Sequence, residues 1–514
     1  MTERPAINLA TLRYLPERVP FIDYRGLLGL FIILITTFAL IMQLISRDLA
    51  TVMNGIAVLT MISVEILVLL GVRELRQNPI HPLCIVIVAS FVYYGMSAVE
   101  LALYPGSSDV PTAHLAQACF LVALSILLYL VGYSSQVGRQ IARAVPLLCF
   151  LPKSKRSAPL WIRASLLYIV GWFGRVFLLS EGVFHVQREL PQYLVQYKSL
   201  FDDVRMFADF SFLAVITLVL KGRAPKLLLL IMLAGEVTYG LLYGGATLIF
   251  FPFVLLLLVY SIYRMSLRWI HVAAGIMLAV FVFGPLGYTY REAYYAYVLT
   301  GNPSVENVGL AAADTMQNTS KDFALQRGRV WSRFSQLDGL LLTLDRVPHL
   351  LPFQYGNTFI PQLLVAPIPR ALWPQKPTLS TGRRFAIEFF DVNDSKSEVG
   401  TNASIGMIAE FYYNFGYFGM AGFLLIGVLI RFFWERMKAY IYLELCAPVR
   451  IPFVLVSLTS LGAPLSLYFG GIIRGSVSLF LYMVILYTRL PTALRDDQNV
   501  TSLPRRGGRQ PFAS

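Results

Sequence analysis

The sequence predicts an all-α protein that crosses a membrane many times, and three observations carry this prediction. The chain of 514 residues is 56% hydrophobic and only 14% charged, with a mean hydropathy of +0.63, whereas about a quarter of the residues of a soluble protein are charged. Twelve apolar runs are suited to crossing a bilayer as helices. The net charge of +14 is spread over many short connections, which argues against a nucleic-acid-binding domain.

The predicted spans are largely uncharged stretches, most of them about 20 residues long. They cover residues 27–46, 51–72, 81–102, 113–134, 161–181, 204–221, 227–243, 246–263, 269–289, 417–434, 450–469 and 476–489. The seventh, eighth and last are the shortest, and Gly244 and Gly245 separate the seventh from the eighth. No small-residue cleavage site follows the first span, so we expect no cleavable signal peptide.

The distribution of lysine and arginine predicts the orientation. With the N-terminus inside, the cytoplasmic segments hold 25 of these residues and the short outer loops hold 4. Cytoplasmic loops carry the excess of positive charge. We therefore expect a multi-pass membrane protein with both termini in the cytoplasm.

One outer loop is too long to be a simple connection. The predicted organisation is an N-terminal membrane bundle (1–289), a large periplasmic loop (290–416), C-terminal membrane helices (417–489) and a disordered cytoplasmic tail (490–514). The loop holds 11 basic and 11 acidic residues, and eight of the bases are arginines. Loops of this length without an obvious second domain are usually functional.

Short elements are predicted within the loop. Apolar residues at helical spacing favour a helix over 323–344, with Arg329 and Arg333 on one face. Seven prolines between 348 and 377 then exclude a continuous helix. A short helix over 404–415 is expected to return toward the membrane, with Gly416 and Gly419 at its junction with the tenth span.

Arginines in this loop are candidates for binding phosphate, because the guanidinium binds phosphate oxygens in a bidentate manner and stays charged. Arg370 lies in the proline-rich stretch LLVAPIPRALWPQKP (363–377), and Lys376 lies beside it. The alternative for Arg370 is pairing with lipid headgroups. A further candidate is the cluster of Arg327, Arg329 and Arg333, which could instead be a solvated helix face. Arg291 and Arg474 are expected beside the outer ends of spans, where they could bind phosphate or instead reach lipid headgroups.

Glu410 is the predicted general base, since the apolar stretch AEFYYNFG around it would raise its pKa. The alternative is a carboxylate that only orients an arginine. Tyr412 and Asn414 could bind sugar hydroxyls, although aromatic packing would also explain the tyrosine. His349 and His185 are further possible bases. No metal site and no cofactor are expected, and the four cysteines form no paired motif.

Several charges fall inside predicted spans. Such residues are costly in hydrocarbon and tend to pair or to line a cavity. Glu236 is expected to face the bundle interior, whereas Arg163 and Arg205 could extend to the interface. The set comprises Glu65, Glu100, Arg163, Arg175, Arg205, Asp209 and Glu236.

Four segments resemble the Wzy-type oligosaccharide repeat-unit polymerases: RGRVWSRFSQLD (327–338), YGNTFIPQL (355–363), IPRALWPQKP (368–377) and SIGMIAEFYYNFGYFG (404–419). The resemblance implies a multi-pass protein of the bacterial inner membrane, with a helical bundle of the glycosyltransferase C type. It implies transfer of a growing glycan from undecaprenyl diphosphate onto an incoming lipid-linked repeat unit at the periplasmic face, with the loop arginines holding diphosphate. It also implies a chain-length-regulating co-polymerase as partner.

Two other functions remain open at this stage. An O-antigen ligase would use the same undecaprenyl-diphosphate-linked oligosaccharide donor with a different acceptor. A lipid-linked oligosaccharide flippase or transporter would favour repeated halves around a central cavity. The single dominant loop of this chain argues against the flippase.

Overall fold

The computed structural model describes an all-helical chain, with no strand among the residues that it describes. These are residues 49–71, 81–103, 112–144, 159–180, 192–243, 305–318, 335–365, 381–391, 404–439 and 465–486, with short pieces between 248 and 297 and at 368 and 373. Within these ranges, five helical stretches are long and apolar enough to cross a membrane. The coarse prediction of a helical membrane protein therefore agrees with the structure.

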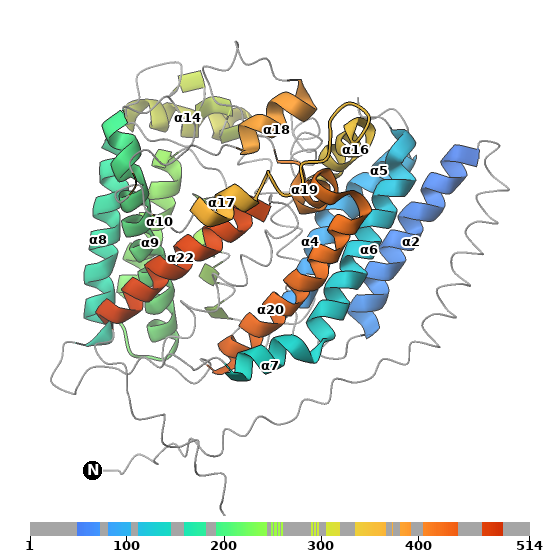
Figure 1. Ribbon diagram of the computed structural model, residues 1–514. Helices are drawn as coiled ribbons and strands as arrows, with labels where there is room; N and C mark the ends of the chain where they lie inside the picture. The colour runs from blue at the N-terminus through green and yellow to red at the C-terminus, as the bar shows by residue number, and fades with distance from the viewer. Residues whose placement is uncertain are drawn as a thin grey trace, which may run out of the picture.

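A first group of helices surrounds the larger apolar core. Its members pack as a bundle in Figure 1, with the short helix α7 closing one end. The group consists of α2 (Leu49–Gly71), α4 (Pro82–Ser90), α5 (Met96–Leu103), α6 (Leu115–Ser134), α7 (Gln136–Ala144) and α20 (Ala421–Ala439). We call the closed end the α7 end.

Glycines let α6 and α20 approach closely. A Cβ atom added at Gly132 would lie 2.0 Å from the carbonyl oxygen of Leu424, and one at Gly427 would lie 2.2 Å from that of Tyr129. Both distances are far below van der Waals contact with backbone atoms, so only glycine fits. Small residues commonly allow such contacts between membrane helices.

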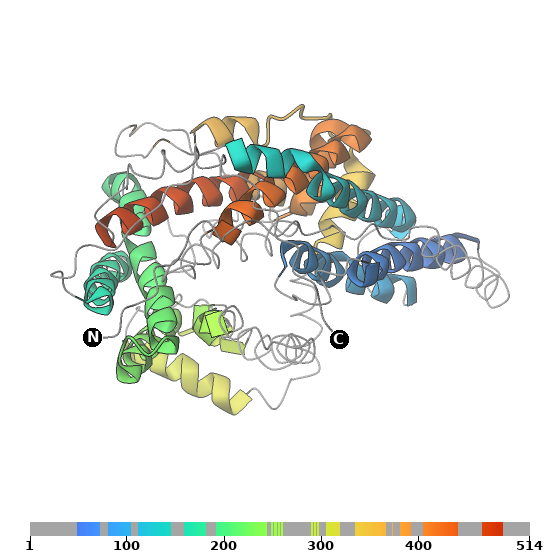
Figure 2. The same ribbon diagram turned by 90° about the horizontal axis from the view of Figure 1, so that it is seen from below.

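A second group of helices surrounds a separate apolar core. It consists of α8 (Leu160–Ser180), α9 (Gln192–Leu220) and α10 (Lys226–Tyr243), and α14 (Val305–Asn318) lies against α10. Gly171 of α8 faces the backbone of Ala208 of α9, so these two helices are also in close contact. The two groups lie on opposite sides of the molecule in Figures 1 and 2.

A layer of short helices covers the other end of the first group, which we call the α19 end (Figure 1). It contains α16 (Leu337–Arg346), α18 (Thr381–Phe390) and α19 (Gly406–Phe415), whereas α17 (Ile360–Val365) packs on α22 (Leu465–Leu486). A 3-10 turn, Gly416–Met420, leads from α19 into α20. The last helix, α22 (Leu465–Leu486), runs obliquely from this layer toward the second group.

A π-helical turn, Phe91–Gly95, separates α4 from α5 and attaches the short-helix layer to the first group. The backbone amide of Gln336, which precedes α16, donates to the carbonyl of Tyr93 at 2.9 Å. A wide turn of this kind interrupts the regular pattern of helical hydrogen bonds, and such turns often mark functional regions. Tyr94, the next residue, packs its hydroxyl against Gly406 at the start of α19.

Helices occupy most of the predicted spans that the structure describes, and the predicted return helix is confirmed as α19, with Gly416 at its end. The predicted helix over 323–344 is wrong in its extent, because residues 335–336 are not helical and α16 begins at Leu337. α9 begins twelve residues before the predicted span at 204. Helices α14, α17 and α18 of the loop were not predicted.

The boundary between the two last spans is also wrong. One helix, α22, runs through residues 470–475, so Arg474 lies within a helix and not in an outer loop. The short gap between the two predicted spans contains the glycines at 470, 471 and 475, and glycine is more frequent in membrane helices than in soluble ones. The first and ninth predicted spans lie outside the described residues.

Candidate functional site

The turn before α17 is bonded to α19 along its backbone. The amides of Gln354 and Tyr355 donate to the carbonyls of Tyr413 and Asn414 at 3.1 and 3.0 Å. The amide of Gly356 donates to the side-chain Oδ1 of Asn414 at 2.8 Å. Tyr355 and Gly356 both have positive φ, which gives the turn its shape. Two of the segments that carry the family resemblance, 355–363 and 404–419, are therefore in direct contact.

Glu410 lies at the centre of this contact and is fully buried. Its Oε1 accepts a hydrogen bond of 2.9 Å from the hydroxyl of Thr358. Its Oε2 accepts a hydrogen bond from the backbone amide of Leu465, the first residue of α22. Both carboxylate oxygens are thus engaged by the protein. This junction joins the turn before α17, the middle of α19 and the start of α22.

Asn414 completes the junction and is also fully buried. Its Nδ2 donates to Thr358 Oγ1 and to the carbonyl of Glu410, both at 2.7 Å. Tyr412, the other predicted sugar ligand, is buried with its ring edge-on to Phe353 and Tyr417. The packing accounts for Asn414 and Tyr412 without a ligand, so sugar binding by them stays a prediction from sequence.

A second set of polar contacts joins α18 to α19. Arg384 Nε donates to Glu388 Oε1 at 2.7 Å, and the hydroxyl of Tyr413 donates to Glu388 Oε2 at 2.9 Å. Arg384 Nη2 also donates to Gln354 Oε1 at 2.7 Å. Neither Arg384 nor Glu388 was predicted to be a site residue, although their spacing of four residues suits an ion pair on one face of a helix.

An exposed ion pair fixes the far end of α18 to α16. Arg346 donates to both carboxylate oxygens of Asp391, at 3.0 and 2.6 Å, and to the carbonyl of Glu388 at 2.6 Å. The Arg346 guanidinium lowers the pKa of the Asp391 carboxyl below its usual range. Together with the α18–α19 contacts, this pair makes α16, α18 and α19 one polar-bonded layer.

The seven predicted phosphate ligands have no described side chain. The side chains of Arg291, Arg327, Arg329, Arg333, Arg370, Lys376 and Arg474 lie outside the described residues, although Arg474 is within α22. Of the possible bases, His349 is exposed on the turn after α16, and His185 is outside the described residues. In the sequence, the stretch that contains Arg370 and Lys376 follows α17 and precedes α18.

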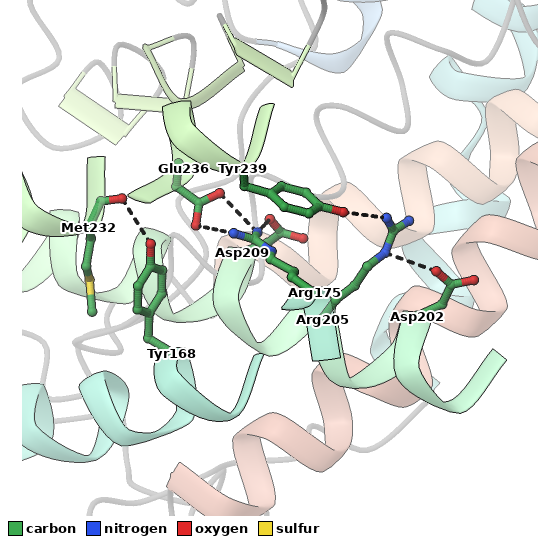
Figure 3. A network of polar contacts seen from close by, with 8 residues as sticks. All are labelled: Tyr168, Arg175, Asp202, Arg205, Asp209, Met232, Glu236 and Tyr239. Carbon is green, nitrogen blue, oxygen red and sulfur yellow. Dashed lines mark hydrogen bonds and ion pairs between the residues drawn. The ribbon is translucent and has the colours of Figure 1, made fainter. Parts of the chain in front are cut away.

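A separate ion cluster is buried among α8, α9 and α10 (Figure 3). Arg175 is almost fully buried and lies between two carboxylates. Its Nη1 and Nη2 donate to Glu236 at 2.8 and 3.0 Å, and Nη2 donates to Asp209 at 2.7 Å. The guanidinium also lies over the ring of Tyr239, 4.3 Å from its centre. The prediction that Glu236 faces the bundle interior is confirmed.

Arg205 extends the ion cluster toward Asp202. Its Nε is 3.2 Å from Asp202 Oδ1, and its Nη1 donates to the hydroxyl of Tyr239 at 3.1 Å. Tyr239 therefore contacts both arginines (Figure 3). Two guanidinium groups and three carboxylates are balanced to within one charge, which suits an apolar environment where an unpaired charge is costly.

A metal site has no support in the described part of the chain, where no group of three or more histidine, cysteine or acidic side chains is placed to hold an ion. The chemistry that the described residues offer is hydrogen bonding and charge pairing. The paired residues described above hold the helices of the site in place.

Long apolar helices, charges paired within the bundle and a polar-bonded layer at one end define a helical membrane protein. The chain belongs to the family described as Domain of unknown function (DUF8712), whose model matches residues 165–439, more than half of its length. No curated protein and no solved structure matches the chain. The matched region begins in α8 and ends with α20. It includes the ion cluster and all of the Glu410 junction except Leu465 of α22.

Proposed function

We propose that this protein is a membrane glycosyltransferase of bacterial surface-polysaccharide assembly, a polymerase of lipid-linked oligosaccharide repeat units. The observation that supports the proposal is the contact between the two motif segments. Residues 355–363 and 404–419 resemble separate parts of the Wzy-type polymerases, and hydrogen bonds from Tyr355, Gly356 and Thr358 join them. The third motif segment, 368–377, lies between α17 and α18 in the sequence.

In the proposed reaction, a hydroxyl of the incoming repeat unit attacks the anomeric carbon of the growing glycan. A new glycosidic bond forms, the bond from that carbon to undecaprenyl diphosphate breaks, and the hydroxyl proton passes to a base. Arg370 and Lys376 would neutralise the leaving diphosphate, since a guanidinium binds phosphate oxygens with two parallel hydrogen bonds. A co-polymerase that regulates chain length is the proposed partner.

The base in this proposal is an open choice between two residues. Glu410 has the surroundings predicted for a base, but its two oxygens already accept hydrogen bonds from Thr358 and Leu465. A base must reach the proton that it removes, directly or through one water molecule. His349, which is exposed at the α19 end, meets this requirement better.

The proposed orientation places the α19 end in the periplasm and the α7 end in the cytoplasm of the inner membrane. The excess of basic residues in the predicted cytoplasmic segments supports it: 25 lie there, against three in the short outer loops once Arg474 is assigned to α22. Fusions of alkaline phosphatase at Asn357 and of a fluorescent protein at the C-terminus test it. We expect an active phosphatase and a bright fluorescent protein, and the reverse pattern would mean an inverted chain.

The chain length of surface glycan in a deletion strain tests the activity. We expect loss of long polymer, with single repeat units still attached to the lipid core, and recovery on complementation. A ligase would instead leave polymer on the carrier lipid and none on the core. A flippase would leave lipid-linked repeat units on the cytoplasmic side of the membrane, so each alternative has its own outcome.

A further inference from the structure

Helix α22 connects the two helix groups. Its first residue, Leu465, belongs to the apolar core of the first group. Its last turns carry Tyr482, Met483 and Leu486, which belong to the core of the second group. Among the described helices, α22 packs on α17 and α19 and also on α8 and α9. Its oblique path across the molecule is visible in Figures 1 and 2.

The start of α22 is held by a carboxylate from another helix. The amide of Leu465 lies in the first turn, where backbone amides have no partner within the helix. It donates to Glu410 of α19, and the other Glu410 oxygen is held by Thr358. A carboxylate at this position binds the free amide and is stabilised by the positive end of the helix dipole.

The other end of α22 is held by a cation from another helix. Arg163, in the first turn of α8, donates from Nη1 to the carbonyl of Leu486 at 3.2 Å. The last carbonyls of a helix lack intrahelical partners and form the negative end of its dipole. The sequence had suggested that Arg163 could extend to the interface. Its contact with the final carbonyl of α22 gives it a defined partner instead.

The second half of α22 is anchored by an aromatic contact. Tyr482 is fully buried between Phe207 and Phe210 of α9. Its hydroxyl accepts a hydrogen bond of 3.3 Å from Ser211. The helix is thus fixed to the second group by its C-terminal turns and to α19 by its first residue.

We propose that α22 sets the spacing between the two helix groups, and that Glu410 and Arg163 are positioning residues that hold its two ends by hydrogen bonds to its first amide and its last carbonyl. Glu410 acts here through Leu465 and Thr358. The same contacts fix the turn that leads into α17, and α17 packs on α22. The distance and melting measurements below test this arrangement without substrate, and only the comparison of turnover rests on the proposed function.

Glutamine at position 410 separates a positioning role from a base. Its amide oxygen accepts from Leu465 and its NH₂ group reaches Thr358, so Glu410→Gln keeps the junction but cannot take up a proton. We expect turnover to fall less than about tenfold, against the hundredfold or more that removal of a general base costs. Glu410→Leu, which cannot bind Leu465, should lose far more activity than Glu410→Gln.

The distance between the two helix groups is measured by double electron–electron resonance between two spin labels on the purified full-length chain. Suitable positions are Phe173 of α8 and Leu425 of α20, which are both highly exposed. Labels introduced through an unnatural amino acid leave the native cysteines unchanged. We expect one narrow distance distribution for the wild type and for Glu410→Gln. Glu410→Leu and Arg163→Leu should each broaden or shift it and lower the melting temperature.

Matched controls are Glu306→Leu in α14 and Arg143→Leu in α7, since both side chains are exposed. They should leave the distance unchanged. If Glu410→Leu does not fold, Thr358→Val removes one hydrogen bond of the junction and Arg163→Leu tests the opposite end. A distance unchanged in Arg163→Leu and in Thr358→Val overturns the proposal. So does a wild-type distance in a folded Glu410→Leu variant. A wild-type distance in Glu410→Gln supports the spacing, and a hundredfold loss of turnover in the same variant would also make Glu410 the base of the proposed reaction.

Discussion

Arg175 binds Glu236 through both of its terminal nitrogens, at 2.8 and 3.0 Å, within the second helix group. The second of these nitrogens also reaches Asp209, which is partly exposed, while Arg175 and Glu236 are buried. The arginine therefore ties α8 to both α9 and α10. The two carboxylates differ in their access to water, so their loss should have unequal effects.

Removal of Glu236 should be the more damaging change. Glu236→Ala leaves a buried guanidinium with one carboxylate, and breaking a buried pair in this way costs about 3–5 kcal/mol of stability. Replacement of both partners, Arg175→Met with Glu236→Met, should recover much of the loss because no buried charge remains unbalanced. Thermal unfolding of the purified protein measures both. A double variant less stable than Glu236→Ala would contradict this account.

Close packing of α6 on α20 predicts a contrast between two glycines. Gly427→Ala would place a methyl group 2.2 Å from the carbonyl oxygen of Tyr129, so the helices must separate, at a cost of roughly 1–3 kcal/mol. Gly475→Ala in α22 meets no atom within 4 Å and should be neutral or stabilising by up to about 1 kcal/mol. Melting temperatures of the two variants, compared in one detergent, test this. Equal effects would mean that the close approach is not rigid.

A pH dependence is expected at Asp338, in the first turn of α16. Burial, together with the charge of Glu100, raises the pKa of this carboxyl above its usual range. The folded state then favours the protonated form, so Asp338 opposes folding increasingly as pH rises above the unfolded value near 3.9. Asp338→Asn should raise the melting temperature at pH 7, and the gain should vanish toward pH 4. A gain independent of pH would show that charge is not the cause.

Arg370 should act through the geometry of its charge, if the proposed function is correct. We expect Arg370→Ala to abolish polymer while the protein still inserts. Arg370→Lys should restore little, because a point charge does not reproduce two parallel hydrogen bonds to phosphate. Gel analysis of surface glycan, with immunoblots for protein level, measures both. Wild-type polymer from Arg370→Ala would remove this residue from the site.

Much of the helical layout could be predicted, because apolar length is a property of the sequence alone. The return helix α19 and its end at Gly416 followed from a short apolar run bounded by glycines. Arg175, Asp209 and Glu236 were recognised as charges inside spans. Their pairing could not be predicted, since it depends on which helices become neighbours.

The errors have a common physical cause. Residues 470–475 were predicted to connect two spans, whereas in α22 the backbone continues as a helix. Helix α18 begins four residues after the last of the seven prolines and was not predicted, although Phe385 and Phe389 have helical spacing and are both buried. Local signals of this kind are overridden by packing, and Glu410 shows the same effect. Its apolar surroundings suggested a base, but the sequence could not indicate that Leu465 would lie against it.

The π-helical turn at Phe91–Gly95 has a consequence for how this span tolerates change. A regular membrane helix uses its carbonyl groups internally and offers none to a neighbour. Here the carbonyl of Tyr93 is the acceptor for Gln336. Deletion of one residue from this turn would leave a span just as apolar, but would rotate everything after it by about 100° and withdraw that acceptor. Apolar substitutions should therefore be accepted where a single-residue deletion is not, so the segment is constrained in its length more than in its composition.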